Sequence, residues 1–224
     1  MKQKIIFWDW TGTLADESKL DENVCKSMEM EIARKNNISF EEAENKYKSY
    51  LKKLENTWKW HDYKLHGKTL DVDWKFHQMS NLKKLVLLPY AKEILEYTKQ
   101  RGYVNVLATN AVRSVILLRL DYAGMSKLFD AVIACDDVQA MKSEGKHFER
   151  GLMLLNGDAA SSFSIGDNPV QDILSAKKIG IRTIFCAFNS NMTHYHSKHI
   201  SANHEENVEA DFTIKDLLGI KSII

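Results

Sequence analysis

The feature that most constrains this chain is a short apolar run near its start, residues 5–8, which ends abruptly in Asp9. An uninterrupted apolar run followed by a turn, here at Gly12, predicts a strand buried on both faces, as in a parallel sheet. Asp9 then lies at the carboxyl end of that strand, where open α/β sheets bind their ligands. A carboxylate at this position is a candidate nucleophile or metal ligand, and the alternative is that it only caps a turn.

Length and charge exclude several classes of protein. A chain of 224 residues can bury a sizeable core and is expected to form one domain, or one domain with a smaller insert. Its 31 basic and 30 acidic side chains give a formal net charge of +1, which argues against nucleic acid as a partner. The 3 cysteines lie far apart without metal-type spacing, which indicates buried thiols of a reducing compartment.

The expected location follows from the same kind of evidence. The first residues lead directly into a strand without a signal peptide, and no apolar run is long enough to span a bilayer. We therefore expect a soluble, cytoplasmic protein with no membrane partner, either a monomer or a homodimer.

From Leu85 onward, the pattern alternates between strands and helices. Pro89 is placed to start a helix that ends before Gly102, and Pro169 to start one that ends at Gly180. The expected strands are residues 104–110, 131–135, 162–168 and 182–187, with a last short strand and a closing helix in 210–218. This alternation predicts an α/β fold with parallel βαβ units and right-handed crossovers, that is, a doubly wound parallel sheet.

Residues 15–88 have a different, helical and amphipathic pattern with no convincing strand. Ser39 and Glu42 predict a capping box, and the helix that follows carries an aromatic stripe as far as Trp58. The second part mixes aromatic and basic side chains: Trp58, Trp60, Trp74, Phe76, His61, Lys64, His66, Lys68 and His77. Such a mixture either lines a pocket for an anionic substrate or forms the packed face of a small helical domain. We expect residues 15–88 to be an inserted cap over a core made of 1–14 and 89–224.

Polar side chains follow the expected strands of the core. They are Asp9, Thr109, Asn110, Lys142, Asp167 and Asp172. The carboxyl ends of parallel strands meet in one crevice, so three carboxylates would lie close together there. Carboxylates at such distances repel unless a cation lies between them, and hard oxygen ligands suit Mg²⁺. We expect Asp167 to bind Mg²⁺ directly, and Asp172 to bind it directly or to support its ligands.

These residue types fit phosphoryl transfer. The reaction needs an oxygen nucleophile in line with phosphorus, and groups that stabilise charge on the equatorial oxygens. Asp9 is suited to attack and form an aspartyl phosphate. Lys142 would neutralise the crowded anions, while the Thr109 hydroxyl and the Asn110 N–H would hold phosphoryl oxygens.

The ordered set of motifs resembles the haloacid dehalogenase superfamily of hydrolases. The motifs are DWTGTL at 9–14, LATN at 107–110, Lys142, and GDNPVQD at 166–172. The chain is most similar to the subgroup with a helical cap, which includes phosphoglycolate-phosphatase-like and β-phosphoglucomutase-like members. The resemblance covers the whole chain. It implies a Rossmann-like core, an Asp nucleophile, Mg²⁺ and phosphatase activity on a small phosphorylated metabolite.

Two positions depart from the family pattern. Phosphatases of the family usually have a second Asp, the general acid and base, where this chain has Thr11. Threonine exchanges no proton near neutral pH, and losing such a group typically costs about 10² to 10⁴ in rate. The backbone carbonyl of Thr11 still suits a metal. Lys142 is followed by Ser143, where the family often has proline, and Lys146 is a less favoured substitute for it.

We therefore expect a slow or selective phosphohydrolase that favours acyl or aryl phosphates. One alternative is a haloacid dehalogenase, which needs no metal and would leave Asp167 and Asp172 without a purpose. Others are a phosphonatase-type hydrolase that uses a cap lysine, or an impaired member that binds a phosphorylated ligand without turnover. Four histidines in residues 194–204 either bind a transition metal or belong to a solvated loop.

Overall fold

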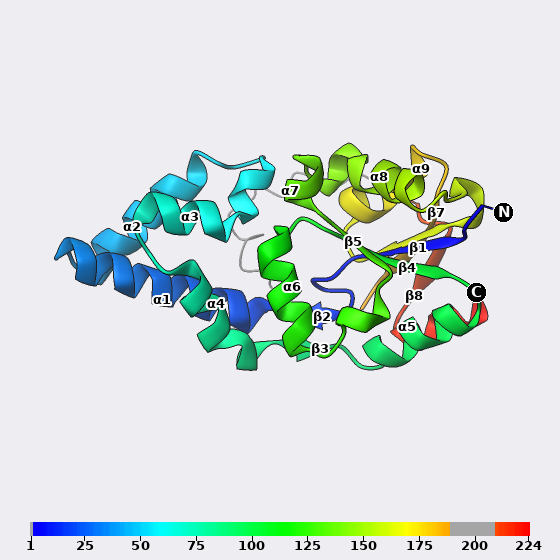
Figure 1. Ribbon diagram of the computed structural model, residues 1–224, viewed down its shortest axis with the longest axis horizontal. Coiled ribbons are helices and arrows are strands. Elements are labelled where there is room, and N and C mark those ends of the chain that lie inside the picture. Colours follow the sequence, from blue (N-terminus) through cyan, green and yellow to red (C-terminus); the bar gives the residue numbers. More distant parts are fainter. Residues whose placement is uncertain (1, 189–208) are drawn as a thin grey trace.

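The computed structural model describes residues 2–188 and 209–224. The chain has a half built on a β-sheet and a half built from helices α1–α4, which lie side by side along the longest axis (Figure 1). The histidine-rich segment 194–204 lies outside the described residues. Within the described ranges, no helix has both the length and the hydropathy needed to cross a membrane.

The sheet has six strands in the order β5-β4-β1-β6-β7-β8, and every neighbouring pair is parallel. Its strands are β1 Ile5–Trp8, β4 Val104–Thr109, β5 Ala131–Ala134, β6 Phe163–Gly166, β7 Arg182–Cys186 and β8 Phe212–Ile214. β1 lies between β4 and β6 and is fully buried. The predicted doubly wound α/β fold is confirmed, and the central strand is the one that carries Asp9.

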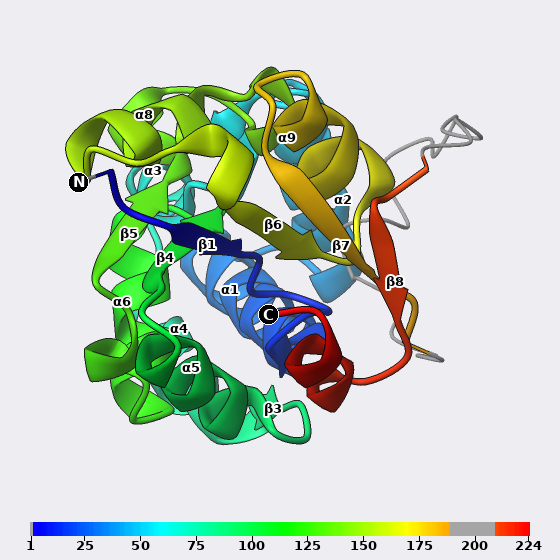
Figure 2. The same cartoon turned by 90° about the vertical axis from the view of Figure 1, so that its right-hand side faces the viewer.

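Alternate residues of β1 contact helices on opposite faces of the sheet, as the period of a strand requires. Ile6 and Trp8 belong to the cluster under α5 and α6, whereas Ile5 and Phe7 belong to the cluster under α8 and α9. The helices are α5 Ala91–Gln100, α6 Arg113–Tyr122, α7 Cys135–Val138, α8 Lys146–Leu154, α9 Ser175–Lys177 and a 3₁₀ segment Leu217–Ser222. Figure 2 places α8 and α9 on one side of the sheet and α5 on the other.

The second half consists of α1 Ser18–Asn36, α2 Phe40–Lys52, α3 Tyr63–Leu70 and α4 Trp74–Asn81, which we call the helical half. The predicted capping box is present, because Ser39 and Glu42 exchange side-chain-to-backbone hydrogen bonds. The prediction that this helix reaches Trp58 is wrong. α2 ends at Lys52, and Asn56 has a left-handed backbone with φ 61°, which interrupts the helical path.

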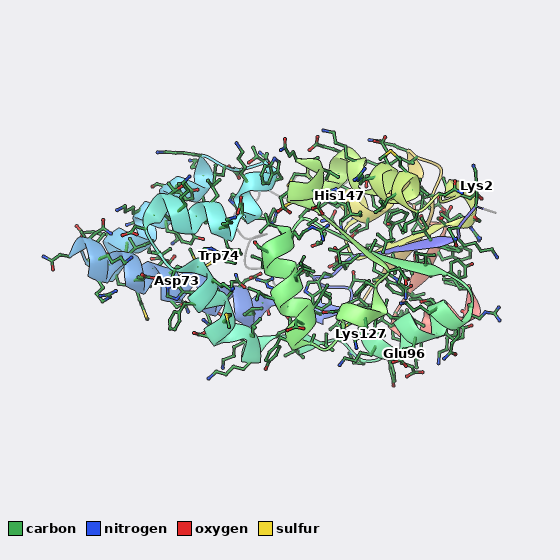
Figure 3. The ribbon with its side chains drawn as sticks, in the orientation of Figure 1. Lys2, Asp73, Trp74, Glu96, Lys127 and His147 are labelled. Carbon is green, nitrogen blue, oxygen red and sulfur yellow. The ribbon has the colours of Figure 1, made fainter. Side chains whose placement is uncertain are left out.

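The aromatic and histidine side chains of the helical half are mostly packed inside it. Trp60 and His66 are buried, and the His66 imidazole contacts the Tyr47 hydroxyl at 3.1 Å. Trp74, labelled in Figure 3, packs so closely on Gly67 that a Cβ there would lie 2.8 Å from its ring. These contacts favour the packed-face interpretation over the substrate pocket.

Two short strands join the halves. β2 Ala15–Asp16 pairs antiparallel with β3 Val86–Leu87, and the Leu88 N–H donates to the Leu14 carbonyl at 2.9 Å. The prediction that residues 15–88 contain no strand is therefore wrong. Strands of two residues are too short to produce a period in the sequence.

Candidate functional site

Three carboxylates meet at the carboxyl edge of the sheet. Asp9, Asp167 and Asp172 each offer an oxygen, and these atoms lie within 4.8 Å of one another. Asp9 follows β1 and Asp167 follows β6, and these strands are neighbours. The Asp9 N–H donates to the Ile165 carbonyl at 2.9 Å, which fixes the end of β1 against β6. The pairing of the two strands therefore brings together side chains that are far apart in the sequence.

A buried lysine completes this cluster. The Lys142 ammonium hydrogen-bonds the Asp9 carboxylate and lies 2.6 Å from the Asp172 carboxylate. It also donates to the Ala108 carbonyl at 3.3 Å, and only 1% of the residue is exposed. Lys146, the substitute considered from the sequence, is half exposed and pairs with Glu144 instead. The structure therefore brings Lys142, and not Lys146, to Asp9.

Burial and charge oppose each other in this cluster. Burial raises the pKa of Asp9 and of Asp172, because a carboxylate loses hydration there, and the Lys142 charge counteracts the rise. Burial would lower the pKa of Lys142, but the Asp172 and Asp9 carboxylates outweigh it and raise this pKa. Three carboxylates against one ammonium leave an excess of negative charge among hard oxygen ligands. This donor set fits a divalent cation such as Mg²⁺.

The loop that carries Asp172 is shaped around its carboxylate. A Cβ on Gly166 would lie 2.1 Å from Asp172 Cγ, so only glycine leaves room for it. The Asn168 side-chain oxygen accepts hydrogen bonds from the first two N–H groups after Pro169, and the Asn168 N–H donates to the Asp172 carboxylate at 2.9 Å. The helix predicted from Pro169 begins as a π-helix, Pro169–Leu174, a conformation frequent at functional sites.

Thr109 is the last residue of β4, and both its hydroxyl and its carbonyl have hydrogen-bond partners. Its hydroxyl accepts the Ala111 N–H at 3.1 Å, which leaves the hydroxyl proton available to another acceptor. Its carbonyl contacts His147 Nε2 at 3.1 Å, and because a carbonyl only accepts, Nε2 carries the proton. Burial and the Lys142 charge lower the pKa of His147 to about 4, so this imidazole is neutral at neutral pH.

His147 was missed by the sequence analysis. It lies in the first turn of α8, where Figure 3 labels it, and its backbone position carries no motif of its own. The sequence shows only a histidine followed by an apolar residue, Phe148. This pattern does not distinguish a histidine of the functional site from one that packs in the core.

Asn110 connects the loops around the cluster through its side chain. Its amide oxygen accepts the Lys142 N–H at 2.8 Å, and its amide nitrogen donates to Gln171 at 2.6 Å. The role predicted for Asn110 from the sequence involves only its backbone N–H. The side chain therefore fixes the segments of Lys142 and Asp172 relative to β4, in addition to the predicted role.

The Thr11 side chain hydrogen-bonds to Glu17, a residue that belongs to none of the four motifs. Its hydroxyl donates to a Glu17 carboxylate oxygen at 2.7 Å, and the Trp10 indole donates to the other oxygen at 2.6 Å. Gly12, which directly follows Thr11, has a φ of 85° and turns the chain sharply before it reaches Glu17. The hydroxyl of Thr13 donates to Asp9 at 3.1 Å, so the turn also supports the central carboxylate.

The fold and this site define a class. They are those of an α/β enzyme that places a carboxylate at the end of the central strand of a doubly wound sheet, beside a buried lysine and two further carboxylates. The profile of the haloacid dehalogenase-like hydrolases matches residues 3–180, and the chain belongs to this family. The resemblance recognised from the four motifs is thereby confirmed.

Relatives in this family are named as phosphatases. Phosphoglycolate phosphatase of Caulobacter vibrioides is 31% identical over 100 residues, which cover 45% of this chain and 42% of that protein. Glyceraldehyde 3-phosphate phosphatase of Pyrococcus furiosus is 26% identical in an alignment 233 positions long, which covers 99% of this chain and 92% of that protein. The chain thus spans less than half of one relative and most of the other.

A solved structure is similar over the whole chain. The crystal structure of an HAD phosphatase from Thermococcus onnurineus superimposes with a TM-score of 0.82 at 26% sequence identity, covering 99% of this chain and 97% of that one. The similarity therefore includes the helical half as well as the sheet.

Proposed function

We propose that this protein is a Mg²⁺-dependent phosphohydrolase that acts on a small phosphorylated metabolite through an aspartyl phosphate on Asp9. The observation that carries the proposal is the buried Lys142 ammonium between Asp9 and Asp172, next to Asp167. This arrangement aims positive charge at the oxygen that would attack phosphorus. The phosphatase names of relatives that belong to the same family support it.

The donor set suits Mg²⁺. Asp9, Asp167, Asp172 and the Thr11 backbone carbonyl would hold the ion, which supplies Lewis-acid stabilisation of the charge on the phosphoryl oxygens.

The residues of the chain divide the chemistry between them. One Asp9 oxygen attacks phosphorus, the bond from phosphorus to the leaving oxygen breaks, and that oxygen takes a proton from solvent. Water then attacks the phosphorus of the aspartyl phosphate, and the bond to Asp9 breaks, which releases inorganic phosphate and restores the carboxylate. The Lys142 ammonium stays protonated throughout, and the Thr109 hydroxyl and the Asn110 N–H hold phosphoryl oxygens.

The choice of substrate follows from position 11. Residue 11 itself carries no carboxylate that could protonate a leaving group, and the Thr11 hydroxyl is donated to Glu17. Acyl and aryl phosphates have leaving groups that need little protonation, so we propose them as the favoured class. Alkyl phosphates would be hydrolysed slowly.

The helical half would act as a cap. We propose that residues 15–88 form this unit over a core of 1–14 and 89–224, and that it closes over the crevice when substrate binds.

The test is hydrolysis of p-nitrophenyl phosphate with and without Mg²⁺, comparing the native chain, Asp9→Asn and the control Asp158→Asn, a partly exposed aspartate outside the site. We expect metal-dependent turnover that is lost in Asp9→Asn alone. Equal turnover in all three chains would refute the proposed nucleophile. Phosphate bound covalently to Asp9 without turnover would identify an impaired member, and metal-independent halide release from a 2-haloacid would identify a dehalogenase.

A further inference from the structure

A buried arginine joins the two halves of the molecule. Arg119 lies on α6, which runs between the helical half and the sheet in Figure 1, and only 3% of it is exposed. Its guanidinium nitrogens lie 2.7 Å from the Glu17 carboxylate and 2.6 Å from the Asp21 carboxylate. One of them also donates to the Gln78 side-chain oxygen at 3.1 Å. A single side chain of the sheet half thus contacts the start of α1 and the middle of α4.

The same cluster reaches the loop that follows Asp9. Glu17 accepts from Arg119 and from the Thr11 hydroxyl on one oxygen, each at 2.7 Å, and from Trp10 on the other. The carbonyl of Trp10 in turn accepts the N–H groups of Leu14 and Ala15, which closes the turn. The side chain of Glu17 therefore connects the arginine directly to residues 10–15, which we call the Thr11 loop.

The composition of the cluster does not maximise stability. Two carboxylates face one guanidinium, and burial raises the pKa of Glu17 against the effect of Arg119. Arg119 Nε and Gln78 Nε2 are buried without a hydrogen-bond partner among the residues that the structure describes. Apolar side chains of similar volume are often as stable or more stable in such places, so a charged cluster there points to a role in specifying geometry.

We infer that Arg119 is a positioning residue, which keeps the Thr11 loop in its place beside Asp9 only while the helical half is docked against α6. The inference rests on the proposed function, because the loop matters for the reaction at Asp9. Separating the helical half from α6 would pull Glu17 and Asp21 away from Arg119 and release the Thr11 hydroxyl. The position of the helical half and the order of the catalytic loop would then change together.

A double-mutant cycle tests this on p-nitrophenyl phosphate. We expect Arg119→Lys and Thr11→Val each to lower kcat on the order of 10- to 100-fold with little change in KM, because a small misplacement of reacting groups has effects of this size. The double variant should be no slower than the slower single variant, because both changes break one connection. Losses that multiply, or an unchanged kcat in Arg119→Lys, would overturn the inference. Arg113→Lys, on the same helix and paired with Asp137, is the matched control and should keep its kcat.

Hydrogen exchange provides a measurement that needs no activity. In the native chain the amides of Leu14 and Ala15, bonded to Trp10, and the amide of Asp21, bonded to Glu17, should open with one common free energy. Arg119→Lys should speed the exchange of all three amides, and Arg113→Lys should not. If the Thr11 loop and α1 open independently in the native chain, the coupling is refuted. This measurement on the native chain decides the question even where Arg119→Lys fails to fold. A failure of the proposed function, seen as turnover that does not depend on Asp9, leaves this exchange result intact and is thus distinguishable.

Discussion

The Thr11 hydroxyl donates a hydrogen bond to the Glu17 carboxylate at 2.7 Å, inside a turn that begins at the central carboxylate of the site. The hydroxyl at position 11 therefore faces an acidic, buried neighbour. Because a threonine satisfies that neighbour with a neutral donor, the side chain at position 11 influences stability as well as chemistry.

Replacing Thr11 by Asp should separate these two effects. The new carboxylate would face Glu17, and this like-charge contact in a buried place should lower the free energy of unfolding by about 1 to 3 kcal/mol. Thr11→Asn, which keeps a neutral donor, should be close to the native chain. Thermal unfolding of the three chains measures this. Turnover of an alkyl phosphate should rise in Thr11→Asp relative to Thr11→Asn, and an equal or lower rate would contradict the account of position 11 as the missing acid and base.

Lys142 should be far more important than its neighbour Lys146. Lys142→Met removes the ammonium that contacts Asp9 and Asp172, and loss of such a preorganised charge typically lowers kcat by about 10² to 10³. Lys146→Met changes a half-exposed pair with Glu144 and should leave kcat nearly unchanged. Steady-state kinetics with Mg²⁺ decide between them, and similar losses in both variants would be inconsistent with the geometry of the site.

Gly166 should tolerate no side chain. In Gly166→Ala the new Cβ would collide with the Asp172 carboxylate. We expect Mg²⁺ to raise the melting temperature of the native chain but not that of Gly166→Ala, and we expect the variant to lose turnover. Gly102→Ala is the matched control, because its Cβ would meet nothing within 4 Å, although φ is +81°. It should cost roughly 1 to 2 kcal/mol of stability from backbone strain and keep full activity. An active Gly166→Ala would show that Asp172 can move freely.

His147 should make stability depend on pH on the acid side. In the unfolded chain a histidine takes up its proton near pH 6.5, whereas in the folded chain burial holds this pKa at about 4. The unfolded state therefore binds more protons between these values, and stability falls as pH decreases through this window, by on the order of 3 kcal/mol in total. Urea unfolding of the native chain and of His147→Gln at several pH values measures the difference. Parallel pH dependences in the two chains would rule out this contribution.

The sheet and its carboxylates were predictable from the sequence because both are encoded locally. The central strand is a short apolar run, and two of the carboxylates, Asp9 and Asp167, follow directly on the ends of β1 and β6. The carboxyl ends of parallel strands lie along one edge of a sheet, so these residues could be expected to meet without knowledge of the strand order.

Other features depend on contacts that no local pattern reveals. Arg119 and Asp21 are 98 residues apart, and their pairing exists only after the helical half has docked. α2 ends at Lys52, and the left-handed backbone of Asn56 further on prevents a continuous helix to Trp58, which the aromatic stripe did not reveal. The π-helix after Pro169 has the same end signals as an ordinary helix, so its wider turn could not be read from them.

The pairing of β2 with β3 has a consequence for the history of such a chain. The hydrogen bond from the Leu88 N–H to the Leu14 carbonyl means that the two ends of the intervening segment touch. A segment with touching ends can be lengthened, shortened or exchanged for another without moving the strands on either side. The sheet could therefore keep one chemistry at Asp9 while the inserted segment changed from lineage to lineage.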